Sequence, residues 1–145
     1  MYKHILIATD GSQLAHKAVA TGIALAQALS ARVTALTVTE PPTNIVPENV
    51  IGATSENEHD AEQYPAVTKA LDAVRDQAEG VGVPCTTLHV QYQYPAETIV
   101  EIADACGCDL IVMASHGRRR LARLLLGGEA VRVLTHAAVP VLICR

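Results

Sequence analysis

The feature that most constrains the fold is a regular alternation of short apolar runs with longer segments of helical periodicity. Near-continuous apolar runs are typical of parallel strands buried on both faces. Parallel strands need right-handed crossovers, which place helices on both faces of a sheet. The pattern therefore predicts a doubly wound α/β fold. Its five expected strands are His4–Ala8, Val33–Val38, Cys85–Val90, Asp109–Ala114 and Pro140–Cys144.

The segments between these runs are mostly helical in periodicity. Apolar residues recur at helical spacing from Leu14 to Leu29 and from Tyr64 to Ala78, the latter helix ending at Gly80 or Gly82. Pro95 can start a third helix. Its expected buried face consists of Ile99, Ile102, Ala103 and Cys106.

Two further segments complete the pattern. Leu121 to Ala137 is expected to be helical with a break at Gly127–Gly128. From Thr39 to Asp60 the periodicity disappears among prolines and polar residues, over a length unusual for a structureless loop. We predict that this segment is a mobile lid or disordered. The length of 145 residues, without repeats or linkers, predicts one domain over residues 1–145.

Composition and charge exclude some classes of partner. The formal charge of −4 argues against a general nucleic-acid or membrane-surface binder, because such proteins usually carry a basic excess. No apolar stretch has the length of a signal peptide or a membrane span, so a cytoplasmic location is expected. The four cysteines are too few and too irregular for a disulfide framework. We interpret them as packing residues, and we predict no metal site.

The first expected strand is followed by Thr9-Asp10-Gly11-Ser12. Asp10 or Ser12 can cap the next helix, and Gly11 can take a turn conformation. Alternatively, Asp10 helps to hold a phosphate-bound Mg²⁺ at the mouth of the sheet. The sequence favours neither role over the other.

A basic, glycine-containing segment follows the fourth strand. Residues 115–135 carry five arginines and one glutamate, a formal charge of +4 in an acidic chain. Glycine turns at the start of a helix expose backbone N–H groups that can bind phosphate. The segment predicts a local anion site, although an arginine run such as Arg118–Arg120 is more often a solvated face. His116 has no partner spaced for catalysis or metal binding, and we interpret it as a turn residue.

Three separated motifs resemble the universal stress protein family over the whole chain: Tyr2–Ser12, Ser115–Arg118 with Leu124–Gly127, and Val139–Ile143. The resemblance implies a Rossmann-like five-stranded parallel sheet, a cytoplasmic location and a homodimer that pairs through its last strand. In ATP-binding members, a glycine pattern ends in Ser or Thr. Here Ala114, Gly117, Gly127 and Gly128 occupy its four positions, so the first glycine and the hydroxyl residue are both replaced.

The resemblance also implies the positions of a nucleotide site. Ala8, Asp10 and Val38 would line the adenosine side of that site. The residues near ribose and phosphates would be Met113, Ala114, Gly117, Gly127, Gly128 and Glu129. Gly128 cannot donate a hydroxyl hydrogen bond, and the β-carbon of Ala114 would crowd a ligand, so weakened ATP binding is expected.

Two hypotheses of function follow from this resemblance. The first is a dimeric stress-response module that binds ATP, with or without Mg²⁺, and acts on an unidentified protein partner. The second is a nucleotide-free dimeric interaction module. We predict that the chain is not an enzyme, because the sequence offers no base to position an attacking water.

Overall fold

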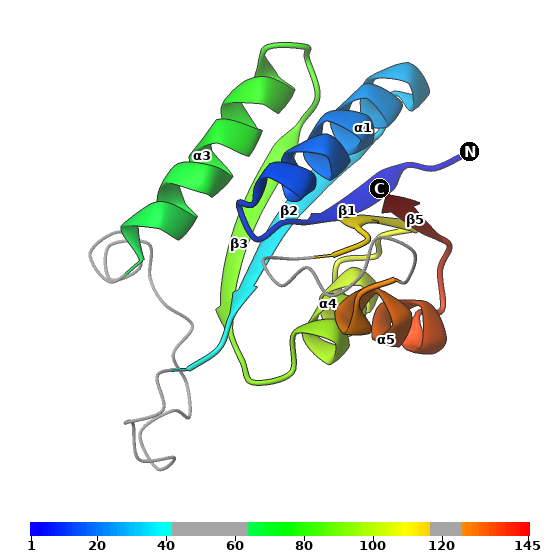
Figure 1. The fold of residues 1–145 in the computed structure, drawn as a ribbon. Helices are drawn as coiled ribbons and strands as arrows, with labels where there is room; N and C mark the ends of the chain where they lie inside the picture. The colour runs from blue at the N-terminus through cyan, green and yellow to red at the C-terminus, as the bar shows by residue number, and fades with distance from the viewer. Residues whose placement is uncertain (42–63, 117–125) are drawn as a thin grey trace.

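The computed structural model describes residues 1–41, 64–116 and 126–145. Five parallel strands form one sheet in the order β3-β2-β1-β4-β5 (Figure 1). The predicted five-stranded parallel sheet is therefore confirmed, with strand ends within one or two residues of those expected. The strands are β1 His4–Ala8, β2 Arg32–Thr39, β3 Cys85–Gln91, β4 Leu110–Ala114 and β5 Val141–Cys144.

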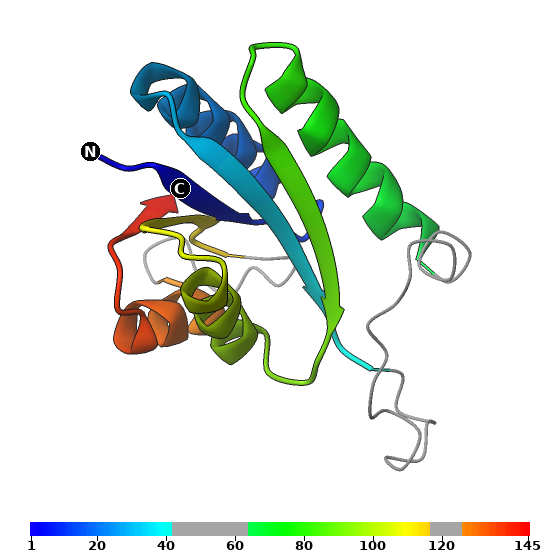
Figure 2. The same ribbon diagram turned by 180° about the vertical axis from the view of Figure 1, so that it is seen from behind.

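Helices cover both faces of this sheet. Helices α1 (Gln13–Leu29) and α3 (Pro65–Glu79) lie on one face, and α4 (Pro95–Ala105) and α5 (Gly128–His136) lie on the other (Figures 1 and 2). The doubly wound architecture is confirmed. None of the helices in the described ranges is long and apolar enough to cross a membrane.

Two predicted segments differ from the structure or fall outside its described part. The predicted lid begins at Thr39, but Thr39 is the last residue of β2, and residues 42–60 of the lid lie outside the described residues. The predicted break at Gly127–Gly128 is confirmed, because helix α5 begins at Gly128, and it ends at His136, one residue before the expected end. Residues 121–125 also lie outside the described part.

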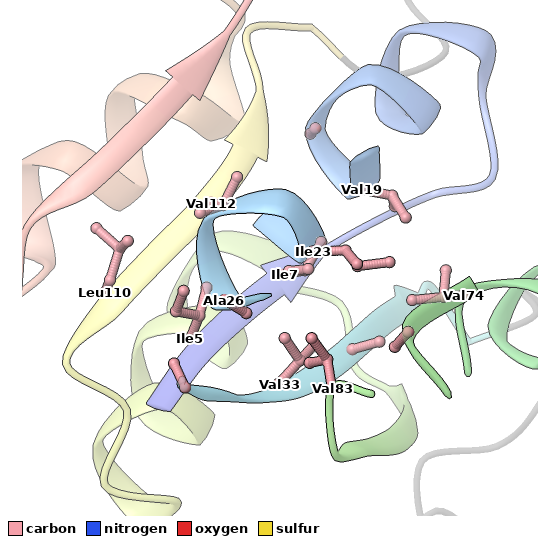
Figure 3. Packing of buried hydrophobic residues seen from close by; sticks show 14 of the residues in the cluster. Ile5, Ile7, Val19, Ile23, Ala26, Val33, Val74, Val83, Leu110 and Val112 are labelled. Carbon is pink, nitrogen blue, oxygen red and sulfur yellow. The ribbon is translucent and has the colours of Figure 1, made fainter. Parts of the chain in front are cut away.

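Strand alternation sorts the buried side chains into two apolar layers. Ile5 and Ile7 of β1 pack against α1 and α3, together with Val33, Leu110 and other residues of that layer (Figure 3). Leu6, between them in sequence, packs into the layer under α4 and α5. Since the strands are buried on both faces, they read as continuous apolar runs.

The sheet has its topological switch point between β1 and β4. The chain passes from β1 outward to β2 and β3 on one side, and then to β4 and β5 on the other. Crossovers leave this point in opposite directions, so the carboxyl ends of β1 and β4 open into a crevice in folds of this kind. The candidate site is therefore expected at the carboxyl ends of β1 and β4.

At the amino-terminal ends of the strands, a buried histidine in β1 predicts that the stability of the fold depends on pH. His4 is 8% exposed, and its Nε2 lies 2.7 Å from Thr34 Oγ1. Burial, with a smaller contribution from the Arg32 charge, lowers the pKa of His4 from 6.5. The unfolded chain therefore binds a proton more readily than the folded one, and this residue costs stability as the pH falls below about 6.5.

We expect the free energy of unfolding to fall more steeply between pH 7.5 and 5.5 for the native chain than for His4→Gln. Glutamine does not titrate, and its amide can still bond to Thr34. Urea unfolding at several pH values measures the difference. Parallel pH profiles for the two proteins would show that His4 titrates alike in the folded and unfolded states.

Candidate functional site

A row of small apolar side chains lies across the carboxyl ends of four adjacent strands. Val90 of β3, Val38 of β2, Ala8 of β1 and Met113 of β4 all belong to the layer beneath α4 and α5. The first three are partly buried and Met113 is 6% exposed. We call these four residues the apolar floor. All four side chains are apolar and uncharged, as the surface beneath a flat apolar group should be.

Strand register gives the floor its shape. Ala8, the last residue of β1, pairs with Leu36, and β2 continues to Thr39. Val38 pairs with Val90 in this extension. Strands β2 and β3 thus project beyond β1, so that Val38 and Val90 stand at the side of the crevice at the switch point.

Three residues of the floor were expected from the sequence, and one was missed. The structure brings Ala8, Val38 and Met113 onto one face, consistent with the adenosine side implied for the first two. Val90 was not anticipated. Its position on the same face follows from the two-residue alternation of β3 once Leu88 is known to pack, partly buried, in that layer.

The turn after β1 is held by hydrogen bonds within itself and from β2. Asp10 Oδ1 accepts from the Ser12 N–H at 2.9 Å, and Ser12 Oγ caps α1 by accepting from the Ala15 N–H at 3.2 Å. Gly11 has φ +77°, a conformation that favours glycine. Thr37 Oγ1 donates to Thr9 O at 2.8 Å. The capping role considered for this motif is therefore filled by Ser12, and Asp10 is fixed beside the end of β1.

The chain returns to the end of β4 at Gly127. The Gly127 N–H donates to Ser115 O at 2.7 Å, and a β-carbon on Gly127 would lie 2.8 Å from that oxygen. This glycine is thus required by a close approach of two backbone segments. The neighbouring Gly128 differs, because a β-carbon there would meet no atom of the described residues within 4 Å.

Helix α5 begins beside this contact with an open N-terminus. Its N-cap is Gly127, and no side chain in the described ranges caps it. The first helical bond runs from the Val131 N–H to Gly127 O, which leaves the N–H groups of Gly128, Glu129 and Ala130 without helical acceptors. Such groups, together with the helix dipole, favour an anion.

The family resemblance implies that Ala114 and Gly117 lie near the ribose and phosphates of a nucleotide. The structure does not bring Ala114 to the floor. Ala114 is 9% exposed and packs in the layer under α1 and α3, on the opposite face of the sheet from the floor. Its β-carbon therefore does not point into the floor, in contrast to the crowding that we expected. Gly117 lies outside the described residues.

The charged residues divide into two groups. Arg118–Arg120 and Arg123 lie outside the described residues. Arg132, the fifth arginine of the basic segment, donates from Nη2 to Glu97 Oε1 of α4, so it ties the two helices together. Glu129 stands exposed in the first turn of α5.

Two further side chains with reactive atoms, His116 and Cys108, are held by local contacts or by burial. His116 Nδ1 lies 3.2 Å from Ser115 Oγ in the turn after β4. Burial, with the neighbouring Cys106, raises the pKa of the Cys108 thiol to about 12, so this cysteine stays protonated and unreactive at neutral pH. Within residues 1–41, 64–116 and 126–145, no group of His, Cys, Asp and Glu side chains is arranged to hold a metal ion.

A hollow of about 430 Å³ lies elsewhere, against α3. All of its lining residues belong to that one helix, and all but one of them are exposed. It is the outer surface of a helix rather than a built site. The lining residues are Pro65, Thr68, Lys69, Asp72, Ala73 and Asp76.

Comparisons with known proteins agree with this fold. The model of the universal stress protein family matches residues 1–145. Universal stress protein MJ0531 of Methanocaldococcus jannaschii is 35% identical over 147 residues, which cover all of this chain and 83% of that protein.

Solved structures show the same fold. The structure of MJ0577, a universal stress protein of the same organism, has a TM-score of 0.79 at 28% identity, covering 99% of this chain and 96% of that one. A universal stress protein solved in complex with cAMP has a TM-score of 0.73 at 24% identity, covering 99% and 97%. The family model and the sequence relative span the whole chain, and the solved structures share its fold. The chain therefore belongs to the universal stress protein family.

Proposed function

We propose that residues 1–145 form one cytoplasmic, dimeric regulatory domain that binds an adenine nucleotide, with ATP as the expected ligand. One observation carries the proposal: the N-terminus of α5, which no described side chain caps, and the apolar floor both lie at the carboxyl ends of the strands and on the same face of the sheet. An anion-binding helix end beside the apolar floor suits a molecule with phosphates at one end and a flat base at the other.

The relatives support this choice of ligand class. One universal stress protein that shares the fold was solved with cAMP, whose adenine and phosphate are the two groups that the floor and the helix end would receive. The ends of β1 and β4 at the switch point are also where doubly wound sheets bind ligands.

The described residues offer no preformed metal cluster, so Mg²⁺ would reach the site bound to the phosphates of the nucleotide. Asp10 is fixed beside the end of β1, and Glu129 stands in the first turn of α5. Both carboxylates would repel phosphates, and a hard cation with oxygen ligands would offset that repulsion. In this proposal Asp10 holds the ion and supplies charge compensation rather than chemistry.

A nucleotide-free interaction module is the alternative, and a specific contact favours it. The Gly127 N–H already bonds to Ser115 O, so it is not available to a phosphate, and Gly128 has no hydroxyl to replace it. Either way the domain acts by occupancy and contact and not as an enzyme. A partner protein would recognise the surface of the domain in that state of occupancy or contact.

Substitutions at Gly128 test the nucleotide site directly. We expect Gly128→Ser to tighten MgATP binding several-fold, because it restores one hydrogen-bond donor to the first turn of α5. No described atom lies within 4 Å of a β-carbon at Gly128, so we expect the serine to be accommodated without strain. Calorimetric titration of the native chain and the variant with MgATP measures the change.

Two controls separate the hydroxyl from other effects. Gly128→Ala adds the same β-carbon without the oxygen and should leave the affinity close to that of the native chain. Ala114→Gly removes a methyl from the opposite face of the sheet, so we expect no gain in affinity from it. If neither the native chain nor Gly128→Ser binds nucleotide while both remain folded, the interaction module becomes the supported function.

The homodimer is proposed from the exposed edge of the sheet. β5 is an edge strand, Leu142 is 38% exposed, and Val131 and Leu134 of the adjacent α5 are 46% and 43% exposed. An apolar edge strand beside exposed apolar helix residues favours pairing with a second copy. We propose that β5 makes this contact.

A further inference from the structure

The link between β3 and α4 carries two exposed tyrosines. Tyr92 and Tyr94 are 50% and 46% exposed, and their rings lie edge to face with centroids 5.9 Å apart. Half-exposed aromatic rings leave a large apolar surface in water, and a neighbouring pair leaves more. The place of the two rings in the fold therefore indicates where a ligand with an apolar surface would bind.

Backbone hydrogen bonds fix this link beside the apolar floor. The Tyr92 N–H donates to Thr39 O at 3.0 Å, next to Val38 at the end of β2. Tyr94 O accepts from the Thr98 N–H at 3.1 Å and from Thr98 Oγ1 at 2.9 Å, which anchors the link to the first turn of α4. The link thus crosses from the projecting ends of β2 and β3 to the helix layer that covers the floor (Figure 2).

The other aromatic side chains are placed elsewhere. The chain has no Phe or Trp, and its four tyrosines are the only large aromatic residues. Tyr2 precedes β1, at the amino-terminal ends of the strands, and packs against the layer under α1 and α3. Tyr64 packs edge to face on His89, with centroids 4.9 Å apart, where α3 begins. Of the four tyrosines, Tyr92 and Tyr94 are the two on the link whose backbone bonds to the end of β2, next to Val38 of the floor.

We propose that Tyr92 and Tyr94 form an aromatic wall of the base subsite and select ligands that carry a nucleobase. This inference rests on the nucleotide-binding function proposed above and assigns the recognition of the base to two residues. Any nucleobase has a π-face that stacks on tyrosine, and the edge-to-face pairing buttresses one ring with the other. The phosphates, in contrast, do not depend on this wall.

Substitution by leucine tests the wall. We expect Tyr92→Leu and Tyr94→Leu each to weaken MgATP binding roughly ten-fold, because leucine keeps apolar volume but cannot stack. Tyr92→Phe and Tyr94→Phe keep the ring and should bind as the native chain does. Binding of magnesium tripolyphosphate, which has no base, should be the same in all five proteins. Calorimetry measures both ligands.

A second measurement uses the native sequence. With 3-fluorotyrosine incorporated, four ¹⁹F signals are expected, assigned by single Tyr→Phe variants. MgATP should shift the signals of Tyr92 and Tyr94 and leave that of Tyr2 in place. If the native chain binds no MgATP, the proposed function fails and the wall with it. If MgATP binds but the leucine variants keep native affinity and the Tyr92 and Tyr94 signals stay fixed, only the wall is overturned.

Discussion

Gly127→Ala is expected to destabilise the domain by roughly 2–4 kcal/mol and to lower Tm by roughly 5–15 °C. The added β-carbon would lie 2.8 Å from Ser115 O, a backbone atom that cannot rotate away. Relief requires the end of β4 and the start of α5 to separate, which breaks the 2.7 Å bond between the Gly127 N–H and Ser115 O. Thermal unfolding followed by circular dichroism measures the loss.

The adjacent glycine supplies a matched control. Gly128→Ala makes the same chemical change where a β-carbon meets no atom within 4 Å, and it replaces the first residue of a helix. We expect it to be neutral or to stabilise the domain by up to about 1 kcal/mol. Equal Tm values for Gly127→Ala and Gly128→Ala would show that the close approach to Ser115 is not a constraint in solution.

Leu142→Lys is expected to convert a dimeric protein into monomers. A lysine at this position would bring a charge and its hydration into the apolar contact proposed between two copies of β5. Val141 is less suited to this substitution, because it packs partly buried against the layer under α4 and α5. Leu142 is 38% exposed, so its substitution changes the edge with less effect on the fold. Sedimentation velocity measures the oligomeric state.

The other edge of the sheet provides the comparison. Thr86 is exposed on β3, so Thr86→Lys adds the same charge to the opposite edge strand. We expect this variant to keep the oligomeric state of the native chain. A native monomer, or a Leu142→Lys variant that sediments as the native dimer does, would contradict pairing through β5.

Local pattern was sufficient to predict the sheet and its helices. A run such as His4–Ala8 is apolar because both faces of the strand are buried, and that requirement is visible in the sequence itself. The predicted buried face of α4 is likewise confirmed, since Ile99 and Ala103 are buried and Ile102 and Cys106 pack against the same layer. Helical spacing alone determines which residues share that face.

The candidate site was predicted in part. Ala8, Val38 and Met113 were named through the family resemblance, and the structure places all three on one face. Ala114 was named with them, but strand alternation turns its side chain to the other face, one residue along from Met113. Position along the chain identified the carboxyl end of β4, but it did not give the direction of each side chain.

The sequence by itself determined the order of strands and helices, because burial on both faces and helical periodicity are properties of neighbouring residues. Tertiary structure decided which glycine is constrained: a β-carbon on Gly127 would meet Ser115 O, whereas one on Gly128 would meet no described atom, although the two are adjacent in sequence. It also decided that the link carrying Tyr92 and Tyr94 lies beside Val38. Both results depend on contacts between segments distant in the chain, and their geometry is set only when strand register and helix packing are in place.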